Sequence, residues 1–320
     1  MTNIRDIAKM AKVSVTTVSR VLNQHPYVSK EKREAVLNAV KISNYHKNIN
    51  AVHLSMGKTF LIGVVLPYSD HPYFGMLLKG IANQALENNY KLVLIQTSYQ
   101  KSMEKEALIM LEQKQIDGLI ICSRISEWDT IKAYLVHGPI VLAEKPSEKQ
   151  ISATYIDHYQ SFYQAIDYLF VNGHRQIGYC INRKTGVSSE QRERAYQTFL
   201  DRNALLYNSA YIFEGCLNFE DGEKVVQQIK TMKNPPSALV VTNDQVAAGI
   251  VICCQNEGIM VPEDLAIIGF DNQPIAKYLG ITTMEIPLLD MGRNLFLQAI
   301  DMNAISQQKV AVYLIERSTV

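Results

Sequence analysis

Short hydrogen-bonding side chains and one arginine gather near the N-terminus. The polar residues of this segment are Ser14, Thr16, Thr17, Ser19, Arg20 and Asn23. Hydroxyl, amide and guanidinium groups of this kind hydrogen-bond to base edges and to phosphate oxygens. Val18, Val21 and Leu22 share one face of a helix, because they are spaced at i, i+3 and i+4. The segment therefore predicts a helix whose outer, polar face can contact nucleic acid.

Three predicted helices position this segment. Asn3 followed three residues later by Asp6 is typical of a helix N-terminus. Ser14 then caps a second helix that ends near Asn23, and Ser29 caps a third. The residues of the third helix expected to face inward are Ala35, Val36, Ala39 and Val40. Two short helices joined by about three residues form a helix-turn-helix, whose second helix fits the DNA major groove. A generic three-helix bundle with a polar surface is the alternative.

The charges of the chain are unevenly distributed. Residues 1–58 contain ten basic and three acidic residues, a net charge of +7, whereas the rest of the chain carries −6. A basic head on a mildly acidic body is typical of a module that contacts a polyanion. A merely solvated basic surface is the other interpretation, and charge alone does not separate the two.

The composition is that of a globular protein with a buried core. Hydrophobic residues make up 47% of the 320 residues, enough for a small module and one or two domains of about 100–200 residues. No apolar run reaches the ~18 residues that a membrane span needs, and the N-terminus has no secretory signal. The five cysteines form no C-x-x-C pair, which favours reduced thiols over disulfides or a zinc site. We therefore expect a cytoplasmic, nucleoid-associated protein without membrane contacts.

From residue 60 the sequence changes to alternating strands and helices. FLIGVVLP, KLVLIQT and DGLIICS predict buried parallel strands, with helices at about 73–88 and 104–113 between them. The pattern recurs about 115–120 residues later, in RQIGYCIN and SALVVTN. Two such units predict a two-lobed, doubly wound parallel-sheet α/β body. Ligands of such sheets bind at the carboxyl ends of the strands, here in the cleft between the lobes.

The sequence lacks the motifs of common enzyme sites. It contains no G-x-G-x-x-G, G-x-x-x-x-G-K-[ST], G-x-S-x-G or H-E-x-x-H, and its seven histidines are scattered. We therefore expect no catalytic residues, no metal site and no cofactor.

The N-terminal residues resemble those of one protein family. The run from Asn3 to Tyr45 carries I-x-D-I-A, V-S-x-x-T-V-S-R-V-L-N and V-S-x-x-x-R. It resembles the DNA-binding head of the LacI/GalR (lactose-repressor/galactose-repressor) family of bacterial transcription regulators. The resemblance implies that Val15, Thr16 and Arg20 read bases. It also implies that the helix is positioned by contacts to the DNA backbone from Ser14, Thr17, Ser19 and Asn23. Lys12 stands in the turn where relatives usually have glycine, at a cost on the order of 1 kcal/mol if φ is positive.

The segment 47–59 resembles the hinge helix and linker of this family. The resemblance implies that it folds on the operator, that Leu54 enters the minor groove, and that Ala51 faces the hinge of a second chain. Lys47 and His53 depart from the usual pattern, so we expect a less pre-formed hinge. An ordinary linker leucine is the alternative for Leu54.

The body resembles the same family, and hence the fold of periplasmic sugar-binding proteins. The matching segments are NGHRQIGYC, VVTNDQVAAGI and VPEDLAIIGFDN. The resemblance implies an effector cleft lined by Tyr73, Phe74, Glu144, Arg192, Asn243 and Asp271. Asp271 would accept hydrogen bonds from hydroxyls, Arg192 would donate two to a hydroxyl pair or carboxylate, and Asn243 would donate one and accept one.

Each of these residues also has a purely structural interpretation. Asp271 and Asn243 could cap turns, Arg192 could pair with a neighbouring glutamate, and the two aromatic residues could belong to the core. Leu217 stands where many relatives have an aromatic side chain that stacks on the ligand, which makes a flat ligand less expected. A sugar or sugar phosphate is the effector that the resemblance favours.

The expected protein is a ligand-responsive repressor of a carbohydrate operon that binds pseudo-palindromic double-stranded operator DNA as a homodimer. We expect a helix-turn-helix domain at 1–46, a hinge at 47–59 and an effector-binding and dimerisation domain at 60–320. Its first lobe would span 60–157 and 288–320, and its second 158–287. No heptad repeat follows the last strand, which favours a dimer over a tetramer. A phosphocarrier partner is compatible with the resemblance. The alternatives are a sugar-binding protein that no longer reads DNA and an α/β enzyme with a fused head.

Overall fold

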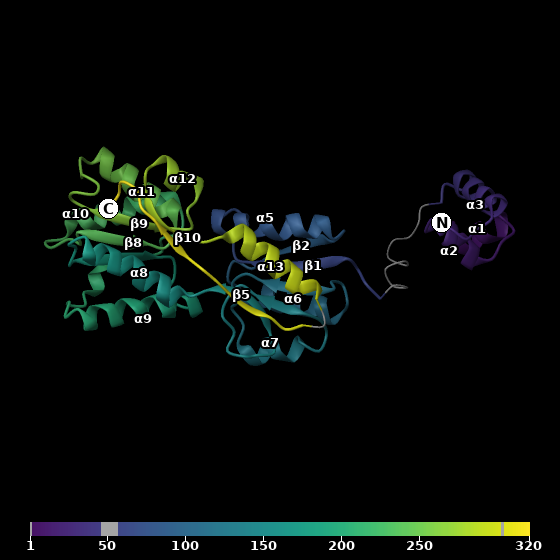
Figure 1. Ribbon diagram of the computed structural model, residues 1–320, viewed down its shortest axis with the longest axis horizontal. Coiled ribbons are helices and arrows are strands. Elements are labelled where there is room, and N and C mark those ends of the chain that lie inside the picture. Colours follow the sequence, from purple (N-terminus) through teal and green to yellow (C-terminus); the bar gives the residue numbers. More distant parts are fainter. Residues whose placement is uncertain (1, 46–56, 302–303) are drawn as a thin grey trace. The chain divides into compact units, whose positions relative to one another are not determined.

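The computed structural model describes residues 2–45, 57–301 and 304–320 (Figure 1). The chain divides into two compact units, residues 1–59 and 60–320. The first is a helical head and the second is an α/β body.

The head packs three helices around a small apolar core. They are α1 (Ile4–Met10), α2 (Val15–Leu22) and α3 (Lys30–Ile42). The predicted capping box at the start of α1 is confirmed, because the Asp6 carboxylate accepts from the Asn3 backbone N–H at 2.9 Å and the Asn3 side chain accepts from Asp6. Ala35 is exposed, contrary to expectation. Helix α3 buries a narrow stripe of Val36 and Ala39, and Ala35 lies outside it.

The turn between α1 and α2 is left-handed at Lys12, its second residue. Lys12 has φ +52°, a backbone conformation that glycine adopts at little cost and lysine does not. Lysine in place of the glycine of relatives therefore strains the backbone locally. The packing of α1 and α2 against α3 through Ile7, Val18 and Val36 offsets this strain.

The described residues of the body form two six-stranded sheets with the same strand order. The first, β11-β5-β4-β3-β1-β2, consists of β1 (Leu61–Leu66), β2 (Lys91–Gln96), β3 (Gly118–Ile121), β4 (Ile140–Leu142), β5 (Ser152–Ile156) and β11 (Gln307–Val310). The second, β12-β10-β9-β8-β6-β7, consists of β6 (Ile177–Ile181), β7 (Ile212–Glu214), β8 (Ala238–Val241), β9 (Ala266–Phe270), β10 (Thr282–Glu285) and β12 (Tyr313–Ile315). All pairs are parallel except β10 with β12.

Helices cover both faces of each sheet, as expected for a doubly wound fold (Figure 1). On the first sheet, one face carries α5 (Pro72–Glu87) and α13 (Leu288–Ile300), and the other carries α6 (Lys101–Glu112) and α7 (Trp128–Tyr134). On the second sheet, one face carries α8 (His158–Val171) and α9 (Val187–Arg202), and the other carries α10 (Phe219–Thr231), α11 (Asp244–Asn256) and α12 (Pro274–Tyr278). The fold class predicted from the sequence is confirmed.

Residues 313–320 lie with the second sheet, whereas we predicted the first lobe for the whole of 288–320; α13 and β11 within that range do lie with the first sheet. Strand β12 pairs antiparallel with β10, with Thr283 opposite Ile315. The Thr319 hydroxyl donates to the carbonyl of Ile267 at 2.7 Å and accepts from the backbone of Thr282 at 2.9 Å. The chain thus crosses between the lobes a third time, because the open edge of β10 offers backbone partners that the final residues satisfy.

Candidate ligand cleft and nucleic-acid interface

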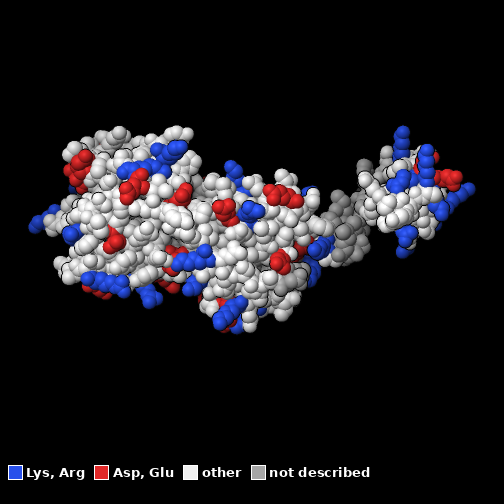
Figure 2. Space-filling view, in the orientation of Figure 1, with Lys and Arg blue, Asp and Glu red and all other residues white. Residues whose placement is uncertain are grey.

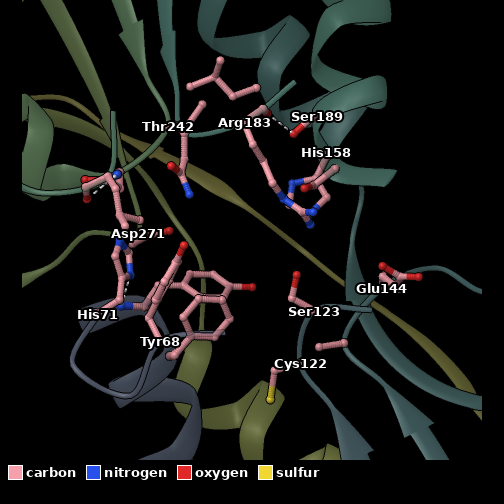
Figure 3. A pocket seen from close by; sticks show the side chains of 18 of the residues that line it. Tyr68, His71, Cys122, Ser123, Glu144, His158, Arg183, Ser189, Thr242 and Asp271 are labelled. Carbon is pink, nitrogen blue, oxygen red and sulfur yellow. Dashed lines mark hydrogen bonds between the residues drawn. The ribbon is translucent and has the colours of Figure 1, made fainter. Parts of the chain in front are cut away.

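A cavity lies between the two lobes at the carboxyl ends of the strands (Figure 3). It encloses about 860 Å³, its open mouth included. Ser123 and Glu144 reach it from the ends of β3 and β4, and Arg183, Thr242 and Asp271 reach it from the ends of β6, β8 and β9. This is the position at which parallel α/β sheets bind ligands.

The structure brings all six residues predicted for the cleft into the wall of this cavity. They are Tyr73, Phe74, Glu144, Arg192, Asn243 and Asp271. Tyr73 and Phe74 lie in the first turn of α5, and Phe74 is also part of the core at 8% exposure. Phe74 is therefore both a residue of the cavity wall and, as its structural interpretation predicts, a core residue. That these residues bind an effector stays a prediction.

Asp271 is a buried carboxyl group with few partners. Its Oδ2 accepts from Nε2 of Gln273 at 3.2 Å, and its backbone has φ +96°. Burial raises the pKa of Asp271 to about 7, although the charge of Arg192 and the Gln273 hydrogen bond oppose this shift. A strained backbone and an under-solvated carboxyl at one position are typical of a binding site. Hydroxyl donors from a ligand would stabilise the ionised form.

Asn243 has a structural role in addition to its place in the cavity wall. Its Oδ1 caps α11 by accepting from the backbone of Val246 at 2.9 Å. Its Nδ2 donates to the carbonyl of Leu217 at 3.3 Å. The turn-cap interpretation is therefore correct, and one Nδ2 hydrogen is left for a ligand.

Arg192 does not pair with a neighbouring glutamate. Glu193 accepts instead from Gln197 at 2.6 Å and from the hydroxyl of Tyr179, and no ion pair of the described residues involves Arg192. Its Nε is buried without a hydrogen-bond partner, as is Nδ1 of His158. Nε of Arg192 is always a donor and therefore lacks an acceptor, whereas Nδ1 of a neutral imidazole can donate or accept.

Glu144 is held by a residue that the sequence did not single out. Nε of Arg124 lies 2.6 Å from Oε1 of Glu144, and its guanidinium lies 4.2 Å from the centre of the Trp128 ring. Burial raises the pKa of Glu144, and Arg124 opposes this shift. Because Arg124 uses one oxygen of Glu144, the other is the one available to a ligand.

The sequence analysis missed several lining residues on the first lobe. Tyr68 and Tyr99 contact each other edge to face at 5.5 Å, and the guanidinium of Arg183 lies 3.8 Å from the centre of the Tyr99 ring. His71 caps α5 by accepting from the backbone of Tyr73 at 3.3 Å. Tyr68 and Tyr99 follow the first two strands directly, so the rule that strand ends meet at the cleft was a usable signal.

The head presents α2 as its candidate nucleic-acid interface. Val15 is 41% exposed, and Thr16 and Arg20 are exposed. Thr17 is used in the cap, since its backbone donates to the Ser14 hydroxyl at 3.2 Å. Figure 2 shows lysine and arginine side chains projecting from the head together with a few acidic ones, and both signs of charge interspersed on the visible face of the body.

Ser19 and Asn23 lie at the C-terminal end of α2, where the Ser19 hydroxyl accepts from the Asn23 amide at 3.5 Å, a long hydrogen bond. Tyr27, in the segment between α2 and α3, is 84% exposed. Ala51 and Leu54 lie outside the described residues.

The described part of the chain contains no group of three or more His, Cys, Asp and Glu side chains able to hold a metal ion. None of its helices combines the length and the apolar character that crossing a bilayer requires.

Comparison with known proteins agrees with this arrangement. Residues 3–48 match the family described as "Bacterial regulatory proteins, lacI family". Residues 59–313 match the family described as "Periplasmic binding proteins and sugar binding domain of LacI family". The chain belongs to the LacI family of bacterial regulators. The family predicted from the sequence is thereby confirmed, and the LacI-family chain is a DNA-binding transcription regulator rather than an enzyme.

Two curated members of the LacI family match nearly the whole chain. The uncharacterized HTH-type transcriptional regulator YkvZ of Bacillus subtilis (strain 168) is 40% identical over the whole of both chains. The NTD biosynthesis operon regulator NtdR of the same organism is 41% identical over 94% of this chain and 92% of its own.

A solved structure of the LacI family shows the same fold. The Lac repressor dimer bound to operator and the anti-inducer ONPF superposes with a TM-score of 0.84. The match covers 99% of this chain and 98% of that chain, at 24% sequence identity.

Proposed function

We propose that this regulator represses its target as a homodimer on a pseudo-palindromic operator, and that a small polyhydroxylated effector in the interlobe cleft controls its operator affinity. One observation carries the proposal: the same chain combines an exposed polar recognition helix with a cleft lined by hydrogen-bonding side chains. The Lac repressor, a dimer on its operator, supports the dimeric state through its similar fold.

On DNA, the proposal assigns base reading to Val15, Thr16 and Arg20. Their side chains lie on the exposed face of α2, and a guanidinium on this face suits guanine in the major groove. Backbone contacts are assigned to Ser14, Thr17, Ser19 and Asn23. In the hinge, Leu54 would enter the minor groove and Ala51 would face the hinge of the second chain. The proposed boundaries are 1–46 for the head, 47–59 for the hinge and 60–320 for the body.

In the cleft, the proposal assigns hydroxyl recognition to Asp271, Arg192 and Asn243. All three present hydrogen-bonding groups to the cavity. Glu144 offers the oxygen that Arg124 leaves free, and Tyr73 and Phe74 form an apolar wall suited to the faces of a sugar ring. The family description names a sugar-binding domain, which supports a sugar effector and, with it, a carbohydrate operon as the target. No observation favours a phosphocarrier partner, which is not part of the proposal.

The mechanism is a change in the relative position of the two lobes. Three chain crossings connect the lobes, and residues from both lobes line the cleft, so a ligand that contacts both favours one arrangement. A coupling of about 2–3 kcal/mol between effector and operator would change operator affinity roughly 30- to 150-fold.

The test is the effector response of Asp271→Ala on operator DNA. A panel of sugars and sugar phosphates is first screened for its effect on the binding of the wild-type protein. The variant should bind operator normally and lose the response, because its head is unchanged and its cleft lacks the hydroxyl acceptor. The matched control is Asp129→Ala, at an exposed position on α7. A normal response in the variant would remove Asp271 from the site, and a wild-type protein that responds to none of the panel would count against a polyhydroxylated effector.

A further inference from the structure

Helix α9 begins at the wall of the cleft without a capping side chain. Its N-cap is Gly186, with φ +103°, and no side chain bonds to its first turn. The first intrahelical bond runs from the backbone N–H of Glu190 to Gly186 at 3.0 Å, so the N–H groups of residues 187–189 precede it. Ser188 and Ser189 line the cavity. The positive end of a 16-residue helix therefore faces the ligand space.

Arg183 places a second positive charge at this helix end. A Cβ at Gly186 would lie 2.8 Å from Nη2 of Arg183, so the glycine lets the guanidinium approach the start of α9. The other side of the guanidinium lies against the Tyr99 ring at 3.8 Å. The Ser189 hydroxyl donates to the carbonyl of Arg183 at 2.7 Å and fixes this loop. No ion pair of the described residues involves Arg183, and the nearby Glu144 is held by Arg124.

Arg192 and His158 add two nitrogen atoms without partners to the same wall. Nε of Arg192 and Nδ1 of His158 are both buried and lack hydrogen-bond partners, and both residues line the cavity. Burial, together with the charge of Arg192, lowers the pKa of His158 well below its usual value, so the imidazole is neutral. Burial raises the pKa of Asp271 to about 7, which weakens the negative charge that this carboxyl group presents to the two guanidinium groups.

We propose that the start of α9, Arg183, Arg192 and His158 form an anion subsite, and that the effector carries a carboxylate or phosphate group besides its hydroxyls. This inference rests on the proposed function of the cleft and adds the charge of the ligand. Figure 3 shows Arg183 and His158 on one side of the cavity and Asp271 on the other. The ligand is therefore oriented, with its anionic group toward α9 and hydroxyls toward Asp271.

Calorimetric titration of the full-length protein without DNA tests this subsite directly. The probes are glucose 6-phosphate, gluconate, glucose and inorganic phosphate, at low ionic strength so that charge is weakly screened. The expected result is that at least one anionic probe binds ten times more tightly than glucose. Arg183→Gln should then weaken that probe at least tenfold and leave glucose unchanged. Arg202→Gln, at the far end of α9, is the matched control and should change neither.

Each outcome of the titration has a defined meaning. Tighter binding of glucose 6-phosphate would show that the anionic group of the effector is a phosphate, and tighter binding of gluconate would show that it is a carboxylate. Glucose binding as tightly as every anionic probe, no binding by any anionic probe, or an unchanged affinity in Arg183→Gln would each overturn the subsite. Because the titration contains no DNA, a failure of operator regulation would contradict the proposed function and leave this result standing.

Discussion

The ionisation of Asp271 in the cleft should change the free energy of unfolding of the body. It is 7% exposed, and its pKa is raised from 3.8 to about 7 by burial. Arg192, Tyr73, Gln273 and the buried Asp244 are the charged and polar groups around it. A carboxyl group whose pKa is raised by folding stabilises the fold fully below its unfolded pKa, and this contribution is lost as pH rises through the folded pKa.

Asp271→Asn should therefore change the pH dependence of stability. Between pH 5 and pH 8 the free energy of unfolding of the wild type should fall relative to that of the variant, on the order of 1–3 kcal/mol, because the variant has no carboxyl to ionise. Urea unfolding of both proteins at four pH values measures the difference. Parallel curves for the two proteins would contradict the raised pKa.

Arg20 is the residue on which sequence reading should depend most. Arg20→Ala should weaken operator binding by about 1–3 kcal/mol and reduce discrimination between operator and random DNA, because a base contact is lost. Arg5→Ala, at an exposed position on α1, is the control. Equal losses on operator and random DNA in Arg20→Ala would show that Arg20 contacts only phosphate.

Individual cleft residues were predictable to different degrees. Asn243 and Asp271 follow strands in recognisable segments, so their place at the cleft could be predicted. Tyr99 and Arg183 also follow strands, but whether such a side chain turns toward the cleft depends on loop geometry, such as the approach to Gly186. The unsatisfied Nε of Arg192 depends on which partners are within reach, which no linear pattern contains.

Helices α5 and α13 pack unusually closely at two glycines. A Cβ at Gly80 would lie 2.2 Å from the carbonyl oxygen of Leu289, and a Cβ at Gly292 would lie 2.2 Å from that of Leu77. Backbone atoms cannot move aside as a flexible side chain can, so any side chain here separates the helices. This contact fixes the first turn of α5, which carries Tyr73 and Phe74 into the cleft.

Gly80→Ala should destabilise the body by about 1–3 kcal/mol, because the added methyl group overpacks the helix contact. Gly75→Ala is the matched control on the same helix, since nothing lies within 4 Å of a Cβ there. The control should leave stability unchanged or raise it by up to about 1 kcal/mol through helix propensity. Equal effects of the two substitutions in urea unfolding would contradict the close packing.

The hinge segment allows a prediction although Leu54 lies outside the described residues. A leucine inserted between base steps bends the duplex, so Leu54→Ala should reduce the bend of operator DNA. Fluorescence energy transfer between the two ends of the duplex measures this bend. An unchanged bend angle in the variant would show that Leu54 is an ordinary linker residue that does not enter the minor groove.

Secondary structure followed the sequence pattern where strands are apolar and failed where they are not. The buried strands β1, β3, β6 and β8 lie within the predicted runs FLIGVVLP, DGLIICS, RQIGYCIN and SALVVTN. Strand β11 (QQKV) is largely exposed, and β12 is three residues long. A strand as short as β12 (YLI) carries no periodic signal that says which sheet it joins, which explains why residues 313–320 were assigned to the wrong lobe.

At the scale of the whole molecule, the body contains the same architectural unit twice, once in each lobe. Both sheets have corresponding strand orders, and the carboxyl ends of both face the same cavity. The sequence contained this information as a repeat of about 115–120 residues. The contacts of the proposed dimer are not encoded in such a pattern, because they depend on a surface that a second chain would cover.

The central claim is that this LacI-family regulator reads a specific operator. The direct measurement is to incubate the full-length protein with genomic fragments, with and without glucose 6-phosphate, gluconate or glucose, and to sequence the fragments retained at moderate salt. The account predicts enrichment of a pseudo-palindrome of about 14–20 base pairs. Binding that is sequence-blind and lost with modest salt under all of these conditions would contradict it.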